Sequence, residues 1–386
     1  MTYVKEPCYN SLQERWRDII IWYFLYILIV ITLIIMVGIS FYKVNQKRKD
    51  KKHIKLTNRW REYLGFVLTD ENAEDLKMQQ KHYNKLHSVE ELMAFYTALL
   101  EYKDSAQMKE NGEFRQFIRE NKSLWVSLGH VYAKKRPIEK AYFAFICEQL
   151  CINTPEEYDE MTKIMQEYAQ EPSIYCRENA LKALYAFGNI DAVVEVFIKL
   201  SRNNSINHRK LVTDGLLEFK GDQIALAESL YNHLDQFKSE YQVAMVDFFR
   251  FSGEPLKNKL IKILKQGDAD KDLVCAILRY YAKYPVQEYK DTILSYLTIP
   301  NEKDWECVSA AALALGKYPG EDTIHALKSV LSSKYWYVRL NAARSIVELD
   351  TEEAELMDIL EGQDSYAKEQ LIYHIKNRKE LRLQNG

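Results

Sequence analysis

The residues in this sequence that could perform metal or redox chemistry are six cysteines and eight histidines. Cys147 and Cys151 lie one helical turn apart, a spacing that would suit a soft metal ion or a redox pair. Phe143, Phe145 and Ile146 surround them, and no second pair completes a tetrahedral site, so we interpret both as small buried thiols. No histidine lies in an H-E-x-x-H motif or beside a cysteine at zinc-finger spacing. The sequence therefore predicts no metal ion and no cofactor.

Catalytic and phosphate-binding motifs are absent as well. The sequence contains no G-x-x-x-x-G-K-[ST], no G-x-G-x-x-G and no G-x-S-x-G, so we expect no catalytic residues and no enzyme activity. The formal net charge is -2, but residues 1–55 carry 10 Lys and Arg against 4 Asp and Glu. The remaining residues, 56–386, then carry 43 against 51, a balance of -8. An acidic balance disfavours a nucleic-acid groove, and we expect no nucleic acid and no small molecule as a partner.

The longest uncharged stretch runs over residues 19–42. These 24 residues reach about 36 Å as a helix, enough to cross a hydrocarbon core of about 30 Å. Trp22, Tyr23 and Tyr42 lie near its ends, where aromatic side chains favour the membrane interface. A cleavable signal peptide is the alternative, but the charges before the stretch are balanced and no small-residue cleavage motif follows. The sequence predicts a transmembrane helix over 19–42.

The flanking charges predict the orientation of this helix. The basic side chains after it are opposed by Asp50 alone, and they are Lys43, Lys47, Arg48, Lys49, Lys51, Lys52 and Lys55. Basic residues stay in the cytoplasm, so we expect residues 1–18 to be a short extracytoplasmic tail and 43–55 a basic juxtamembrane segment. The predicted location is the plasma membrane in a single pass, with a bacterial inner membrane favoured.

Residues 137–386 repeat with a period of about 32 residues. Trp305–Ala312 aligns with Trp336–Ala343 at an offset of 31 residues, and both tryptophans are expected to pack at seams between repeats. Each repeat has an anchor followed three and seven residues later by small or apolar residues, and the anchors are Arg177, Arg209, Gln242, Val274, Val308 and Arg339. Scarce glycine (13) and proline (8) disfavour a barrel or sandwich. The period predicts stacked helical hairpins, each too small to bury both of its faces alone.

Three cysteines fall within this repeat pattern. Cys176, Cys275 and Cys307 each lie next to an anchor, where a small core side chain is expected. In a cytoplasmic array these thiols should be reduced.

The stretch from Val338 to Ala343 reads V-R-L-N-A-A, which resembles the V-R-x-x-A-A signature of short HEAT-like repeats of the phycobilin-lyase type. The resemblance covers about 172–376 and extends less clearly back to 137. It implies an all-α fold, an α-solenoid of HEAT-like hairpins preceded by a single transmembrane helix, and the repeats bring no catalytic residues of their own. HEAT-like enzymes that bind iron use His-Glu dipeptides, and this sequence contains none. Residues 56–136 are predicted to be an irregular helical N-terminal cap of the 137–386 array, or a separate small helical module.

The resemblance implies that the second helices line the inner side of the solenoid. The matching positions here are Tyr158, Glu195, Lys199, Tyr231, His233, Lys257, Tyr289, Tyr296 and Lys328. Tyrosine is a rigid contact residue that is enriched in binding hot spots. We therefore expect a non-enzymatic membrane-anchored scaffold or adaptor that binds a protein partner of a membrane-associated system. A lyase-like or cofactor-handling enzyme built on the array is the alternative, and a lipid-surface or self-assembling role also stays open.

Overall fold

The computed structural model describes residues 7–69, 76–103, 113–203, 208–298 and 304–385, and all regular secondary structure in these ranges is helical. The chain divides into two compact units, Met1–Phe117 and Ile118–Gly386, which we describe separately. The predicted all-α fold class is confirmed.

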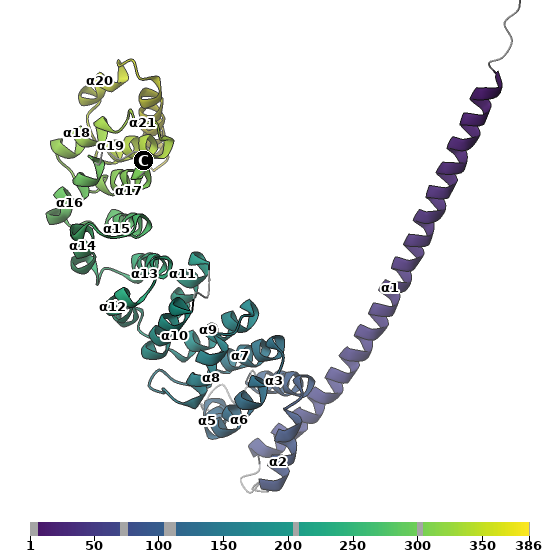
Figure 1. Ribbon diagram of the computed structural model, residues 1–386. Coiled ribbons are helices and arrows are strands. Elements are labelled where there is room, and N and C mark those ends of the chain that lie inside the picture. The colour runs from purple at the N-terminus through teal and green to yellow at the C-terminus, as the bar shows by residue number, and fades with distance from the viewer. Residues whose placement is uncertain (1–6, 70–75, 104–112, 204–207, 299–303, 386) are drawn as a thin grey trace, which may run out of the picture. The chain divides into compact units, whose positions relative to one another are not determined.

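The first unit is built on one very long helix, α1 (Pro7–Thr69), of 63 residues. It is followed by α2 (Leu76–Lys85) and α3 (Val89–Lys103), and α5 (Glu113–Glu120) begins in this unit. Within the described ranges, α1 alone has the length and apolar composition to cross a membrane, and no residue of its most apolar window is buried. Figure 1 shows α1 as one long continuous helix. This long apolar N-terminal helix is consistent with a single membrane span.

Beyond its apolar stretch, α1 becomes a packing partner of α3. Trp60 is almost completely buried, its Nε1–H donates to Glu91 Oε2 at 2.9 Å, and its ring lies 4.9 Å from that of Phe95. Arg61 adds a hydrogen bond from its Nε to Glu101 Oε2 at 2.8 Å. Because no break separates the apolar stretch from these contacts, one continuous helix carries both.

The second unit consists of helical hairpins stacked in two rows, which Figure 1 shows side by side. The first row contains α7 (Pro137–Leu150), α9 (Ile174–Phe187), α11 (Arg209–Leu217), α13 (Ser239–Ser252), α15 (Lys271–Lys283), α17 (Trp305–Leu315), α19 (Trp336–Glu348) and α21 (Ser365–Asn385). The second row contains α8 (Glu160–Tyr168), α10 (Ile190–Arg202), α12 (Gln223–Asn232), α14 (Lys257–Gln266), α16 (Lys290–Leu294), α18 (Glu321–Ser329) and α20 (Met357–Leu360). Helix α6 (Lys122–Ala133) packs on α7 and α8. Short 3-10 turns extend the second row, namely η1 (Leu234–Gln236), η2 (Gln287–Tyr289), η3 (Ser295–Leu297) and η5 (Glu353–Leu356).

The anchors of the predicted repeat pattern lie in the helices of the first row. Every anchor from Arg177 to Arg339 lies in a first-row helix, one in each of α9, α11, α13, α15, α17 and α19. In α19 the small and apolar residues that follow the anchor, Ala342 and Ile346, are completely buried, because they face the neighbouring helices. The pattern thus gives both the helix and the face that it buries.

A partly buried polar network fixes the start of α8. The Asp159 carboxylate accepts hydrogen bonds from the backbone N–H groups of Met161 and Thr162, from Asn153 Nδ2 at 2.7 Å, and pairs with Lys122 Nζ at 2.6 Å. Burial raises the pKa of Asp159, but these hydrogen bonds to the charged form outweigh it and hold the pKa below its usual value. The carboxylate therefore satisfies helix donors that would otherwise lack partners.

Candidate functional site

The predicted partner-binding residues lie along the second row of helices and its turns. Tyr158 precedes α8, Glu195 and Lys199 lie on α10, Tyr231 and His233 at the end of α12, Lys257 on α14, Tyr289 and Tyr296 in η2 and η3, and Lys328 on α18. They follow one side of the array and do not converge on one pocket.

One group of these residues is brought together between α8 and α10. The Tyr158 hydroxyl donates to Glu195 Oε2 at 2.6 Å, and Lys199 Nζ lies 3.3 Å from Gln166 Oε1. Burial and the nearby Glu195 carboxylate raise the pKa of Tyr158, so its hydroxyl stays a donor at neutral pH. Tyr158, Glu195 and Lys199 are thus a small polar cluster that links two adjacent repeats.

The other tyrosines connect neighbouring second-row helices. Tyr231 and Tyr296 each donate a hydrogen bond of 3.2 Å to a backbone carbonyl of α14, and Tyr289 donates to Asn258 Oδ1 at 3.1 Å. Burial raises the pKa of Tyr231 and of Tyr296. The Tyr231 and Tyr296 hydroxyls satisfy helix carbonyls of an adjacent repeat, which gives them a structural role that the sequence pattern did not reveal.

The remaining predicted residues also have partners within the chain. His233 Nδ1 lies 2.8 Å from a carbonyl of its own helix, and Lys257 Nζ lies 3.3 Å from Glu254 Oε2. Lys328 Nζ donates to the Glu355 carbonyl at 2.6 Å. No two of these three residues share a partner among these bonds, so they form no common site.

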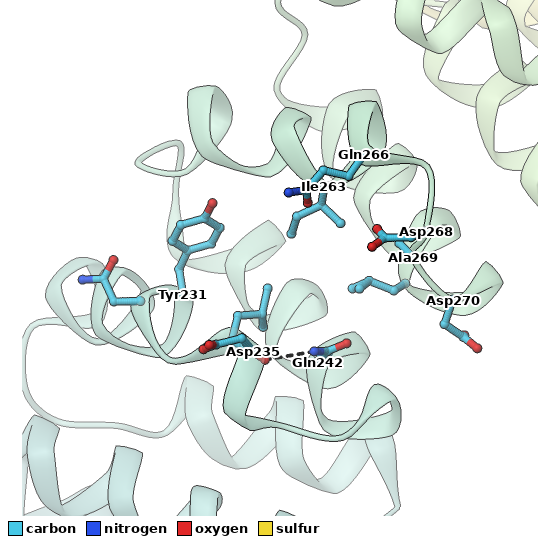
Figure 2. A pocket seen from close by; sticks show the side chains of 11 residues that line it. Tyr231, Asp235, Gln242, Ile263, Gln266, Asp268, Ala269 and Asp270 are labelled. Carbon is cyan, nitrogen blue, oxygen red and sulfur yellow. Dashed lines mark hydrogen bonds between the residues drawn. The ribbon is translucent and has the colours of Figure 1, made fainter.

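Figure 2 shows a hollow of about 640 Å³ beside Tyr231. Its lining residues are Tyr231, Asn232, Leu234, Asp235, Gln242, Ile263, Gln266, Asp268, Ala269, Asp270 and Leu273. Gln242 Nε2 donates to the Leu234 carbonyl at 3.0 Å, and Asp270 accepts from a backbone N–H at the start of α15. Its ionisable lining residues are Asp235, Asp268, Asp270 and Tyr231, and the lining contains no cysteine, serine, histidine or lysine.

A second hollow, of about 680 Å³, lies between α19 and α21 and was not predicted. Trp336 forms part of its lining, so it lies at a repeat seam as expected, but it is 49% exposed and only partly packed there. Trp305 packs more closely, with its ring 5.2 Å from Tyr335 and 6.0 Å from Tyr337, both nearly parallel. The indole of Trp305 is thus stacked at the α17–α19 seam, while that of Trp336 is half-exposed at the α19–α21 seam.

The cysteines differ in their surroundings. Cys147 is buried, and burial raises the pKa of its thiol well above the usual value. Cys151 is exposed, contrary to the interpretation of both as buried thiols, because it ends α7 in a left-handed conformation with φ 46°. Cys275 and Cys307, on α15 and α17, have Sγ atoms 3.4 Å apart, and a hydrogen bond from Cys307 lowers the pKa of Cys275. In the described ranges no three His, Cys, Asp or Glu residues are grouped to hold a metal ion.

The predicted membrane-interface residues all lie on α1. Each is exposed in the structure, and they are Trp22, Tyr23, Tyr42, Lys43, Lys47, Arg48 and Lys49. The aromatic residues bracket the apolar stretch, and the basic ones follow it on the same helix.

A comparison with known protein families supports the fold. The family model of HEAT repeats matches residues 258–347, which run from α14 to α19. No curated protein matches the sequence. Among solved structures, human deoxyhypusine hydroxylase in complex with glycerol is similar at 13% identity, over 72% of this chain and 97% of that chain, with a TM-score of 0.26. The stacked hairpins and the family-model match over residues 258–347 show the fold, an all-α solenoid of HEAT repeats that carries a long apolar N-terminal helix.

Proposed function

We propose that this protein is a non-enzymatic, membrane-anchored scaffold whose HEAT-repeat array binds a protein partner of a membrane-associated system. The proposal depends most on one observation, the exposed apolar surface of α1. Its apolar window has no buried residue in the structure, so nothing in the described chain removes that surface from water. Exposed apolar surface is unfavourable by about 25 cal/mol per Å², and a lipid bilayer is the environment that fits a helix of this length.

The continuity of α1 supports a tether with a defined length. From Tyr42 at the end of the apolar stretch to Trp60 in the contact with α3, the helix rises about 27 Å. Basic residues occupy the first part of this interval, which favours a cytoplasmic location for the array and a bacterial inner membrane as the host.

The array supplies surface rather than reaction chemistry. The second row of helices and its turns carry polar residues that bridge repeats, such as Tyr158 with Glu195 and Tyr289 with Asn258. Tethering an array beside the bilayer raises its effective concentration for a partner in the same membrane, so a groove of modest affinity is sufficient.

The anchor is tested by membrane retention after carbonate extraction. Leu33→Lys with Met36→Lys places two charges in the apolar stretch, and each charge opposes insertion by about 2.5–3.5 kcal/mol at the centre of a membrane helix. We expect this variant to leave the membrane fraction. Val44→Lys with Ile54→Lys is the matched control on exposed positions of the same helix and should stay in the membrane. Release of the wild-type protein by carbonate would refute the anchor.

The scaffold role is tested by crosslinking in intact membranes. A specific crosslinked partner should disappear when residues 118–386 are removed, since these form the second unit. Retention of the same crosslink after the deletion would indicate that the first unit, and not the array, binds the partner. A preparation that carries a chromophore or a metal would instead support the cofactor-handling alternative.

A further inference from the structure

Two cysteine side chains meet at the seam between α15 and α17. These helices are neighbours in the first row, and Figure 1 shows them side by side. The sulfur atoms of Cys275 on α15 and Cys307 on α17 lie 3.4 Å apart, and the two residues are only 2% and 4% exposed. The sulfurs are therefore in direct contact, so a small movement of either side chain brings them to the bond length of a disulfide, about 2.05 Å.

The repeat register puts this pair where another seam holds apolar side chains. Cys275 follows the anchor of α15, and Cys307 precedes the anchor of α17. The residues in the equivalent places at the α13–α15 seam are Val243 and Leu273, and both are buried. Because apolar side chains fill the equivalent place, packing of the seam does not require that two sulfur atoms meet here.

The pair lies just below the surface of the array. Cys275 is in the second turn of α15, and Cys307 is in the first turn of α17. Beside them Lys271 Nζ and Glu306 Oε1 form an ion pair at 2.8 Å, and these two side chains are 39% and 31% exposed. Cys307 Sγ lies 3.6 Å from the Lys271 carbonyl, next to this ion pair. Since each repeat contacts only its neighbours, opening of this single seam is enough to admit a small oxidant.

The two thiols differ in acidity. A hydrogen bond from the Cys307 thiol lowers the pKa of Cys275, and the positive charge of Arg279 acts in the same direction. Burial and the carboxylates of Asp272 and Glu306 oppose this shift without outweighing it. The same hydrogen bond, together with burial, raises the pKa of Cys307. Cys275 is thus the sulfur that more readily becomes a thiolate, which is the nucleophilic form.

We propose that Cys275 and Cys307 are a redox-sensitive crosslink, which a hydroperoxide converts from two thiols into a disulfide that joins α15 to α17. The Cys275 thiolate attacks one oxygen of the hydroperoxide, a sulfur–oxygen bond forms as the oxygen–oxygen bond breaks, and water or an alcohol leaves. The Cys307 sulfur then attacks the Cys275 sulfur, the disulfide forms, and the oxygen leaves as water with the Cys307 proton. In all, the two thiols lose two electrons and two protons, and the hydroperoxide takes them up.

The disulfide would make one seam of the array resistant to opening. The two cysteines are 32 residues apart in the sequence, so the bond closes a loop that contains most of one repeat and stabilises the folded state. A dithiol reductant returns the pair to thiols, which makes the crosslink reversible. The inference goes beyond the proposed function, because it concerns how the array responds to oxidation whichever partner it binds.

The experiment treats the full-length protein in detergent micelles with increasing concentrations of hydrogen peroxide. N-ethylmaleimide then blocks the remaining thiols, and non-reducing peptide mass mapping identifies the state of each cysteine. We expect the Cys275–Cys307 disulfide to form before the other buried thiols, Cys147 and Cys176, react. The oxidised protein should melt at least about 5 °C above the reduced protein, and dithiothreitol should reverse this shift.

Two single variants separate the roles of the two sulfurs. Cys307→Ser should stop the reaction at a sulfenic acid on Cys275, which dimedone traps as an adduct that mass mapping detects. Cys275→Ser should give neither the disulfide nor a dimedone adduct at Cys307. Hydrogen peroxide should raise the melting temperature of neither variant.

The matched control is Cys176→Ser. Cys176 is also a buried first-row cysteine that precedes an anchor, and its sulfur lies 3.6 Å from the Tyr168 carbonyl. This variant should keep both the disulfide and the shift in melting temperature, and circular dichroism should show wild-type helix content in all three variants. The proposal would be overturned if Cys176→Ser lost the disulfide, or if the wild type formed it only after its other buried thiols had reacted. Disulfides between other cysteines, or a melting temperature that oxidation leaves unchanged, would overturn it too.

Discussion

The close packing of α17 on α19 can be tested by adding a single methyl group at Gly316. This residue follows α17 with helical backbone angles, φ −61° and ψ −5°, so alanine fits its backbone without strain. The new Cβ would lie 2.7 Å from Ser345 Oγ and 3.1 Å from Ser345 Cβ. The cost of Gly316→Ala is therefore the cost of moving α19, not of bending the backbone.

The magnitude follows from two opposing effects. Overpacking a tight contact costs about 1–3 kcal/mol, whereas replacing glycine by alanine stabilises by about 0.4–1 kcal/mol through the unfolded chain. We expect Gly316→Ala to lower the free energy of unfolding by about 1–2 kcal/mol. For a unit of this size, that shift lowers the melting temperature by about 2–4 °C per kcal/mol.

Ser345 provides the second arm of a double-mutant cycle. Its side chain is completely buried, and its Oγ has no hydrogen-bond partner among the described residues. Ser345→Ala removes both an unsatisfied hydroxyl and the atom nearest to the new methyl group, so by itself it should be neutral or stabilising. In the double variant most of the loss caused by Gly316→Ala should disappear, which gives a coupling energy of about 1 kcal/mol or more.

The measurement is thermal unfolding of the full-length protein in detergent, followed by far-ultraviolet circular dichroism. All four proteins of the cycle are compared under the same conditions. Additive effects within about 0.5 kcal/mol, or a Gly316→Ala variant as stable as the wild type, would refute the reasoning. The seam would then accommodate the added methyl group, and the contact between Gly316 and Ser345 would not limit how closely α17 and α19 approach.

Three further predictions concern the second unit. The pKa of Asp159 is depressed in the folded state, so its contribution to stability is present above the unfolded pKa of about 3.9 and is lost as the pH falls. The difference in melting temperature between wild type and Asp159→Asn should therefore disappear below about pH 4. A difference that stays constant with pH would contradict this prediction. The buried Tyr168 hydroxyl donates a hydrogen bond to the Gly129 carbonyl at 2.7 Å, so Tyr168→Phe should lower the free energy of unfolding by about 1–2 kcal/mol. Denaturant unfolding measures this change, and an unchanged unfolding midpoint would contradict the predicted contribution of the hydrogen bond. Cys275 and Cys307 have sulfur atoms 3.4 Å apart, so they should form a disulfide when the folded protein is treated with the thiol oxidant diamide. Peptide mass mapping would identify the pair. Disulfides between other cysteines instead would argue against the proximity of these two.

Much of the fold could be predicted because it depends on local periodicity. The anchors at intervals of about 32 residues all lie in first-row helices, since the small residues after each anchor must face the next repeat. The exposure of Cys151 could not be predicted, because an apolar helix gives no sign of the residue at which it will end in a left-handed turn. The candidate surface was placed on the second row by resemblance alone, and the hollow beside Trp336 was missed.

The sequence by itself determined the apolar stretch, the charge step that follows it and the period of the array. These are properties of neighbouring residues along one chain, so a single helix or hairpin displays them. Only the tertiary structure decided that Tyr231 and Tyr296 bind carbonyls of α14, and that Trp305 is stacked while Trp336 is half-exposed. The physical reason is that hydrogen-bond partners and seam widths depend on how closely two helices approach, and that distance is set by side chains about one repeat apart in the sequence.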